Sequence, residues 1–173
     1  MDSRAKAFGH AIHPILIVFP LGLLGTAAIF DAIYLVTYNN TWPTVSFWML
    51  VAGLIGGVVA ALFGLIDFLN IPNHTRAKRI GLYHALVNVS AMVLFALALF
   101  LRWDTPLRPT TIALVCSFAG LALALLGGWF GGELVERLGV GVSPEAGLNA
   151  PNSLTHGKAF DMDVRQHNFH PTR

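Results

Sequence analysis

Four long apolar runs restrict what this chain can fold into. They are Ala11 to Tyr34, Val45 to Leu69, Ile80 to Leu101 and Thr110 to Gly132. A helix that crosses a membrane needs about 20 apolar residues, because each residue adds about 1.5 Å and the hydrocarbon core is roughly 30 Å thick. Each run meets that length. The sequence therefore predicts an all-α membrane protein with four transmembrane helices.

The segments between the runs are short and rich in Asn and Pro, which makes neighbouring helices antiparallel. We predict an up-and-down four-helix bundle within residues 1–142, with a polar, flexible C-terminal tail over 143–173. The predicted helices cover residues 11–34, 45–69, 80–101 and 110–136. We recognise no internal repeat. Charged residues make up 12% of the chain, against about 25% in soluble domains, so a water-soluble fold is excluded.

The basic residues are distributed unevenly between the two sides of the predicted membrane domain. Nine of them fall on side A, which holds both termini: Arg4, Lys6, Arg76, Lys78, Arg79, Arg137, Lys158, Arg165 and Arg173. Side B has only Arg102 and Arg108. Short cytoplasmic segments are enriched in Lys and Arg, so we expect both termini in the cytoplasm, with the protein in the bacterial inner membrane. This distribution also explains the net charge of +2 without a nucleic-acid partner.

Small residues on two of the runs predict where helices pack closely. Gly53 and Gly57 lie four residues apart in the second run, and the fourth run holds two such pairs, Gly127 with Gly131 and Gly128 with Gly132. Lipid gives no hydrophobic drive between helices, so association depends on close backbone approach at such positions. We expect all three pairs to face other helices.

Four polar residues inside the apolar runs fall at one depth. His13, Asp67, His84 and Glu133 each belong to a different predicted helix, and each lies near side A because the helices alternate in direction. Polar groups within a membrane are costly and normally face the interior of a bundle. We therefore predict a polar layer to which every helix contributes one residue.

The composition of this layer suggests three alternatives. In a square bundle the first and third helices are diagonal, so His13 and His84 can face each other and act as axial ligands of a b-type haem, with Asp67 and Glu133 around them. Two His and two carboxylates also suit a non-haem iron, manganese or zinc ion. The third alternative is a hydrogen-bonded cluster without a cofactor. The spacing alone does not decide between them.

Three further polar residues lie in or near the apolar runs: His10, Asn88 and Asp31. His10 precedes His13 by three residues and is either a second group around the same cofactor or an interface residue. Asn88 lies one turn beyond His84 and can line the same face or bond to a neighbouring helix. Asp31 lies near side B, and we interpret it as an interfacial carboxylate.

Four segments carry a family resemblance: "HPILIVFPLGLL" (His13 to Leu24), "GLIDF" (Gly64 to Phe68), "YHALVNV" (Tyr83 to Val89) and "GGWFGGELVERLGVGV" (Gly127 to Val142). They resemble a bacterial family of predicted membrane proteins known as domain of unknown function 2231. The resemblance implies a four-helix membrane domain, and its motifs include the four residues of the polar layer. Members of that family look similar to segments fused to Rieske iron–sulfur domains, which favours electron transfer. This chain lacks the Cys and His pairs of a Rieske cluster, so a redox partner would be a separate protein.

Three functions follow as hypotheses. The first is a small electron-transfer subunit that binds b-type haem, which would be an electron carrier rather than an enzyme. The second is a non-catalytic accessory or structural subunit of a larger membrane complex. The third is a protein that binds a metal ion in the bundle core. The expected partners are the lipid bilayer and a membrane or redox protein, or a second copy of the chain.

Overall fold

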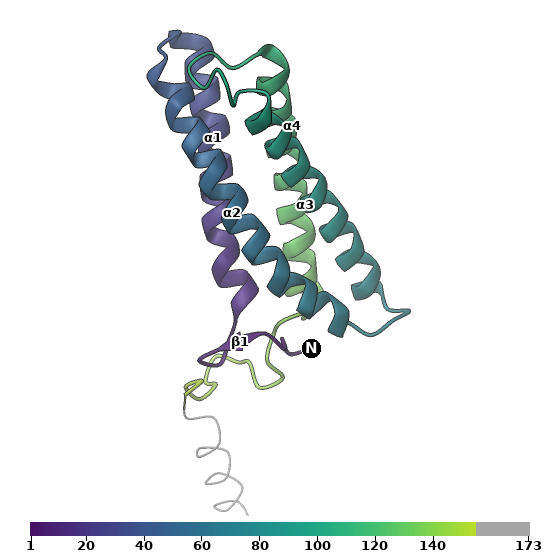
Figure 1. Ribbon diagram of the computed structural model, residues 1–173. Coiled ribbons are helices and arrows are strands. Elements are labelled where there is room, and N and C mark those ends of the chain that lie inside the picture. The colour runs from purple at the N-terminus through teal and green to yellow at the C-terminus, as the bar shows by residue number, and fades with distance from the viewer. Residues whose placement is uncertain (155–173) are drawn as a thin grey trace, which may run out of the picture.

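The computed structural model describes residues 1–154 and contains four long helices (Figure 1). They are α1 (Ile12–Thr37), α2 (Thr41–Asn70), α3 (Arg76–Phe100) and α4 (Thr111–Gly132). All four are long and apolar enough to cross a membrane. The prediction of an all-α membrane bundle is thereby confirmed. Of the predicted tail, residues 155–173 lie outside the described residues.

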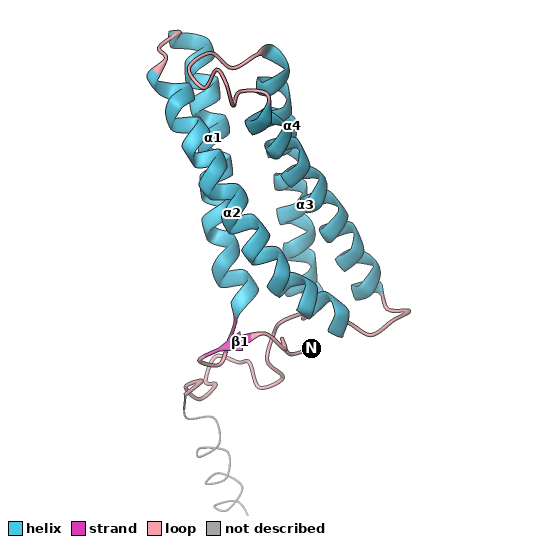
Figure 2. Cartoon of the chain, viewed as in Figure 1, coloured by secondary structure: helices cyan, strands magenta, loops and turns pink. Residues whose placement is uncertain are grey.

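The helices form two antiparallel hairpins. α1 packs along α2 and α3 packs along α4, while contacts between the two hairpins, α2 with α3 and α1 with α4, are much less extensive. Figure 1 shows the N-terminus and the chain beyond α4 at the same end of the bundle. A small antiparallel hairpin of β1 (Lys6–Ala7) and β2 (His10–Ala11) precedes α1 (Figure 2).

The helices extend beyond the apolar runs that predicted them. α2 begins at Thr41 and α3 begins at Arg76, each four residues before its predicted start. At α3 the Thr75 hydroxyl accepts a hydrogen bond from the Lys78 backbone N–H at 3.1 Å, which caps the helix within a polar segment. Hydropathy marks the part of a helix that lies in hydrocarbon, and the polar first turn continues beyond it. At its other end, α4 continues into a short π-helix, Glu133–Arg137.

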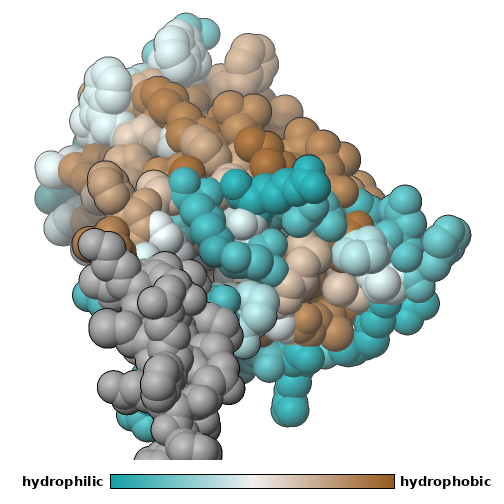
Figure 3. Space-filling view, turned by 90° about the horizontal axis from the view of Figure 1, so that it is seen from below, coloured by the Kyte–Doolittle hydropathy of each residue, from teal (hydrophilic) through white to brown (hydrophobic). Residues whose placement is uncertain are grey.

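The surface has the division expected of a membrane domain. Each helix exposes large apolar side chains, among them Val18, Leu62, Leu86 and Ile112. Seen from the end that carries the N-terminus, hydrophilic residues gather across that end and hydrophobic residues lie beside them (Figure 3). Apolar side chains on the flanks need no protein partner where lipid surrounds them.

The interior of the bundle is built from a few large apolar side chains packed against small ones. Its centre consists of Leu24, Ala27, Leu50, Phe95 and Ala98. A Cβ on Gly53 would lie 2.7 Å from Leu24 Cδ2, so any side chain at this position of α2 would displace the Leu24 side chain of α1. The predicted close approach at Gly53 is present because side chains of α1 occupy the space that a Cβ would need.

A buried ion pair joins the two hairpins near side B. The guanidinium of Arg102 donates from Nη1 to Asp31 Oδ1 at 2.9 Å and from Nη2 to Asp31 Oδ2 at 3.0 Å, and neither side chain is exposed. Arg102 also donates to the Ser46 hydroxyl at 3.2 Å and to the Ala98 carbonyl at 3.0 Å. The interpretation of Asp31 as an interfacial carboxylate is therefore wrong. Its cation, Arg102, lies just beyond the end of α3; Arg102 and Arg108 are the two basic residues that the sequence places on the same side as Asp31.

We predict that the stability of the bundle requires either both members of this ion pair or neither. Arg102→Met should lower the free energy of unfolding by about 3–5 kcal/mol, because it leaves the Asp31 carboxylate buried without a partner. The double variant Asp31→Leu with Arg102→Met should recover most of that loss, because it leaves no unpaired charge. Reversible unfolding of the purified protein in mixed micelles measures both values. Equal losses in the single and double variants would contradict a role for charge.

A second prediction concerns the glycine faces. Gly53→Leu should cost about 1–3 kcal/mol or more by overpacking against Leu24. Gly128→Leu is the matched control, because a Cβ on Gly128 meets no heavy atom within 4 Å. The expectation that Gly128 and Gly132 face another helix is wrong, since both positions are open in the described part of the chain. Thermal melting in detergent should fall for the first variant only, and an equal fall in both would contradict this packing.

Candidate functional site

The structure brings His13 of α1 and His84 of α3 into contact inside the bundle. Their ring centres are 6.4 Å apart and the ring planes meet at 87°. His13 lies in the first turn of α1, and His84 lies about two turns into α3, which runs in the same direction. Both side chains are half-buried. The two imidazoles that the sequence placed on diagonal helices are thus neighbours, and their role as ligands stays a prediction.

Each imidazole is oriented by a backbone carbonyl of the neighbouring helix. His13 Nδ1 lies 2.8 Å from the Ala60 carbonyl oxygen of α2, and His84 Nδ1 lies 2.9 Å from the Gly127 carbonyl oxygen of α4. A carbonyl only accepts, so both contacts place the ring proton on Nδ1. The Nε2 lone pair of each ring is then free, and within the described residues neither Nε2 has a hydrogen-bond partner. This is how proteins prepare histidine for metal ligation.

Both rings also lie against glycines. A Cβ on Gly64 of α2 would come within 2.8 Å of His13 Cε1, and a Cβ on Gly131 of α4 would come within 3.3 Å of His84 Cε1. In each hairpin the glycine follows the accepting carbonyl by four residues, which is one helical turn. Each imidazole is therefore held by a carbonyl and accommodated by the absence of a side chain one turn further on.

This arrangement reveals a correspondence that the sequence analysis missed. The carbonyl and glycine of α2 belong to AALFG, residues 60–64, and those of α4 belong to GGWFG, residues 127–131. Both read small, small, large, Phe, Gly. We recognised no internal repeat because five residues are too few to stand out. Their equivalent contacts with His13 and His84 make the correspondence visible, and they identify Ala60 and Gly64 as site residues.

Asn88 lies beside His84, as its spacing of one turn indicates. Its amide nitrogen donates to the His84 carbonyl at 2.8 Å and lies 3.3 Å from His84 Nδ1. Because Nδ1 carries the ring proton, the first contact is the hydrogen bond. A Cβ on Gly127 would come within 2.5 Å of the Asn88 side chain, so Asn88 fills the space that Gly127 leaves. Asn88 therefore supports the position of His84 on α4.

Asp67 lies at the predicted end of the bundle, but its carboxylate has other partners than the two histidines. Asp67 Oδ1 accepts from the Ser3 hydroxyl at 2.7 Å and from the backbone N–H groups of Arg4 at 3.1 Å and Ala5 at 3.5 Å. Ser3 and Ala5 are buried by this contact. The carboxylate thus fixes the N-terminal segment across the end of α2.

Glu133 and His10 also have partners of their own. The Glu133 carboxylate pairs with the Arg76 guanidinium at the start of α3, in a pair that is partly exposed. Such a pair contributes little to stability. His10 lies on β2, outside α1, and its Nε2 is 3.4 Å from the Ser153 hydroxyl in an exposed contact. Among the residues that the structure describes, none of these three groups has a hydrogen bond to His13 or His84.

The geometry limits what the site can hold. Within residues 1–154 no group of three or more His, Cys, Asp or Glu side chains lies close enough together to hold a metal ion. The site therefore presents two imidazoles in contact, each with one ring nitrogen that has no partner within the described residues. Two donors are half of the usual set for a zinc ion and a full axial set for a haem iron.

One protein family matches most of the chain. A family model described as "Predicted membrane protein (DUF2231)" matches residues 9–144. No curated protein and no solved structure matches the chain. The matched residues include all four helices and both histidines of the pair.

Proposed function

The chain belongs to the DUF2231 family of predicted membrane proteins, and within that membrane setting we propose that it is an electron carrier holding a b-type haem between His13 and His84. The observation that carries the proposal is the pair of free Nε2 lone pairs on equivalent helices, each fixed by a carbonyl on Nδ1. Neutral imidazole with its other nitrogen bound in this way is the usual form of a metal-ligating histidine.

The separation of the rings supports the same proposal. Metal–imidazole bonds of about 2.0–2.1 Å put the centres of two opposed rings roughly 6 Å apart. The measured separation of 6.4 Å is close to that value. A porphyrin supplies four further nitrogens, so a haem needs no protein ligand beyond the two histidines.

A non-haem iron, manganese or zinc ion remains the alternative cofactor. It would need further ligands, and the nearest candidates among the predicted residues, Asp67 and Glu133, are bonded to the N-terminal segment and to Arg76. The two histidines would have to share the ion with water. The haem proposal requires no carboxylate ligand from the chain.

The proposed chemistry is electron transfer. A haem iron held by both histidines would have no open position for oxygen or another substrate. The chain's own contribution is to fix both imidazoles through the Ala60 and Gly127 carbonyls. The redox partner would be a separate membrane or soluble protein that approaches the end of the bundle near the histidines.

We further propose that both termini face the cytoplasm of a bacterial inner membrane. The distribution of basic residues supports this orientation: Arg102 is buried in the ion pair, so Arg108 is the exposed basic residue of the α3–α4 connection. A reporter fused after Val142 should therefore show a cytoplasmic location. The matched fusion in the α3–α4 connection should show a periplasmic one, and the reverse pattern would refute the orientation.

The haem proposal predicts a specific spectrum. The protein purified in detergent from haem-producing cells should show a sharp Soret band typical of a low-spin iron, which shifts on reduction with dithionite. His13→Ala and His84→Ala should each remove one axial ligand, converting the iron to high spin or abolishing haem retention. Absorption spectroscopy and a pyridine haemochrome assay measure both effects.

Three variants serve as controls for the histidines. His74→Asn should leave the spectrum unchanged, because His74 lies in the α2–α3 connection and its backbone has a positive φ that Asn tolerates. Asp67→Asn and Glu133→Gln should retain the haem, since their carboxylates bond elsewhere. If elemental analysis finds stoichiometric iron, manganese or zinc and the spectrum has no Soret band, the cofactor is a metal ion and not haem. A purified protein that carries neither pigment nor metal would contradict both the haem and the metal-ion proposal, and would leave the accessory-subunit function.

A further inference from the structure

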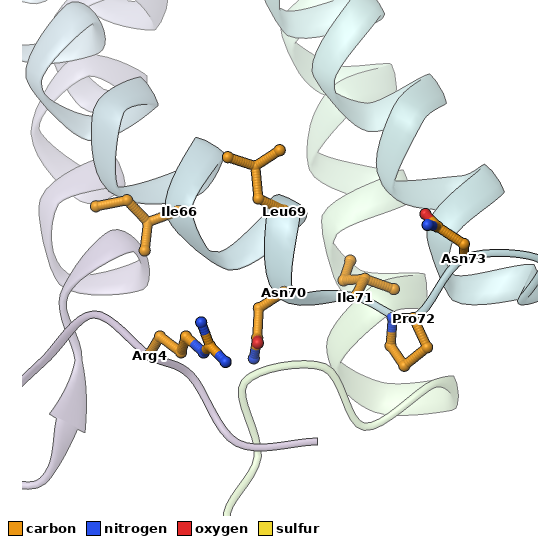
Figure 4. A pocket seen from close by; sticks show the side chains of 7 residues that line it. All are labelled: Arg4, Ile66, Leu69, Asn70, Ile71, Pro72 and Asn73. Carbon is orange, nitrogen blue, oxygen red and sulfur yellow. The ribbon is translucent and has the colours of Figure 1, made fainter.

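A shallow depression of about 440 Å³ lies at the end of the bundle, between the N-terminal segment and the last turn of α2 (Figure 4). Two kinds of group line it. Arg4, Asn70 and Asn73 are polar, while Ile66 and Leu69 are apolar. The depression is separate from the histidine pair, because neither His13 nor His84 lines it.

Arg4 is held in this depression by its backbone. The Asp67 carboxylate accepts from the N–H groups of Arg4 and Ala5, and from the Ser3 hydroxyl. The Arg4 side chain itself is exposed, and within the described residues its guanidinium has no hydrogen bond or ion pair. Figure 4 shows the side chain extending toward that of Asn70. A fixed backbone with an unpaired guanidinium is a preorganised donor for an anion.

Three other basic side chains at this end have partners, while the exposed Arg79 does not line the depression. Lys78 Nζ donates to the Phe68 carbonyl at 2.7 Å, and Lys6 pairs with Asp2. Arg76 pairs with Glu133. Asp67 forms no ion pair with the Arg4 guanidinium within the described residues, because its Oδ1 accepts from the Ser3 hydroxyl and from the backbone N–H groups of Arg4 and Ala5.

The apolar side of the depression continues into the flank of the bundle. Leu69 is 68% exposed and Ile66 is 44% exposed, and both lie in the last turns of α2, a helix long and apolar enough to span the membrane. A ligand that bonds to Arg4 and Asn70 can therefore extend an apolar chain along Ile66 and Leu69. Arg in such a position suits the phosphate oxygens of a lipid headgroup.

We propose that this depression binds the phosphate group of an anionic membrane phospholipid, with Arg4 as the principal donor. The Asn70 amide contributes a further hydrogen bond, and Ile66 and Leu69 contact the start of an acyl chain. The proposal is independent of haem. It assigns Asp67 a positioning role, since that carboxylate holds the segment from which Arg4 reaches the site.

Binding of phosphatidylglycerol to the full-length protein in detergent tests the proposal, measured by native mass spectrometry. Arg4→Ala should weaken binding by at least about tenfold, because the charged donor is lost. Arg79→Ala is the matched control: it removes an exposed Arg at the same end that does not line the depression, and binding should stay unchanged. Leu69→Ser should weaken lipid binding without altering any response to inorganic phosphate. Gel filtration and circular dichroism confirm that each variant is folded.

Two further ligands test which part of the phospholipid supplies its affinity for the protein. Diacylglycerol, which lacks the phosphate, should bind at least about tenfold more weakly than phosphatidylglycerol. Inorganic phosphate at matched ionic strength should not raise the melting temperature as the lipid does. The proposal is overturned if Arg4→Ala binds the lipid as well as the unchanged protein does, or if Arg79→Ala loses as much. Equal binding of diacylglycerol, or full stabilisation by inorganic phosphate alone, also overturns it.

Discussion

A hydrocarbon layer offers no hydrogen bonds, so a polar group that the chain places inside it is costly unless it finds a partner within the protein. This constraint explains the main contacts of the bundle. Arg102 and Asp31 satisfy each other at one end, and the two imidazoles take carbonyls of adjacent helices at the other. The apolar part of the interior is packed around Phe95 and Leu50, and α4 adds the buried Ser117 hydroxyl, which has no hydrogen-bond partner within the described residues. The positions of the helices follow from where these polar groups can be satisfied.

The two hairpins solve the same local problem in the same way. Each presents a histidine from its first helix to a carbonyl of its second, with a glycine one turn beyond that carbonyl. The likeness makes the two Nε2 atoms equivalent donors, as a symmetric cofactor site requires. It does not extend to the rest of the chain: Asp31 belongs to the first hairpin alone, and its cation comes from the second.

The sequence predicted the architecture and the histidine pair because both follow from period and polarity. Apolar length sets the number of helices, and alternation of direction places His13 and His84 at one depth. The partners of the carboxylates were not predictable in this way. Asp67 bonds to backbone groups of the N-terminal segment, which no pattern of side chains announces. Asp31 pairs with a residue beyond the end of α3, and only the path of the chain after Phe100 brings Arg102 inside.

The division of the ion pair between hairpins has a consequence for biosynthesis. Asp31 lies six residues before the end of α1, about 9 Å from that end, and it enters the membrane before Arg102 has been translated. Without Arg102 the buried carboxylate has no cation, and inserting such a charge into the membrane costs up to about 3.5 kcal/mol of free energy. The first hairpin alone is therefore an incomplete membrane unit, and the arrival of the second removes its exposed charge. A chain truncated before Arg102 would keep that carboxylate without its cation.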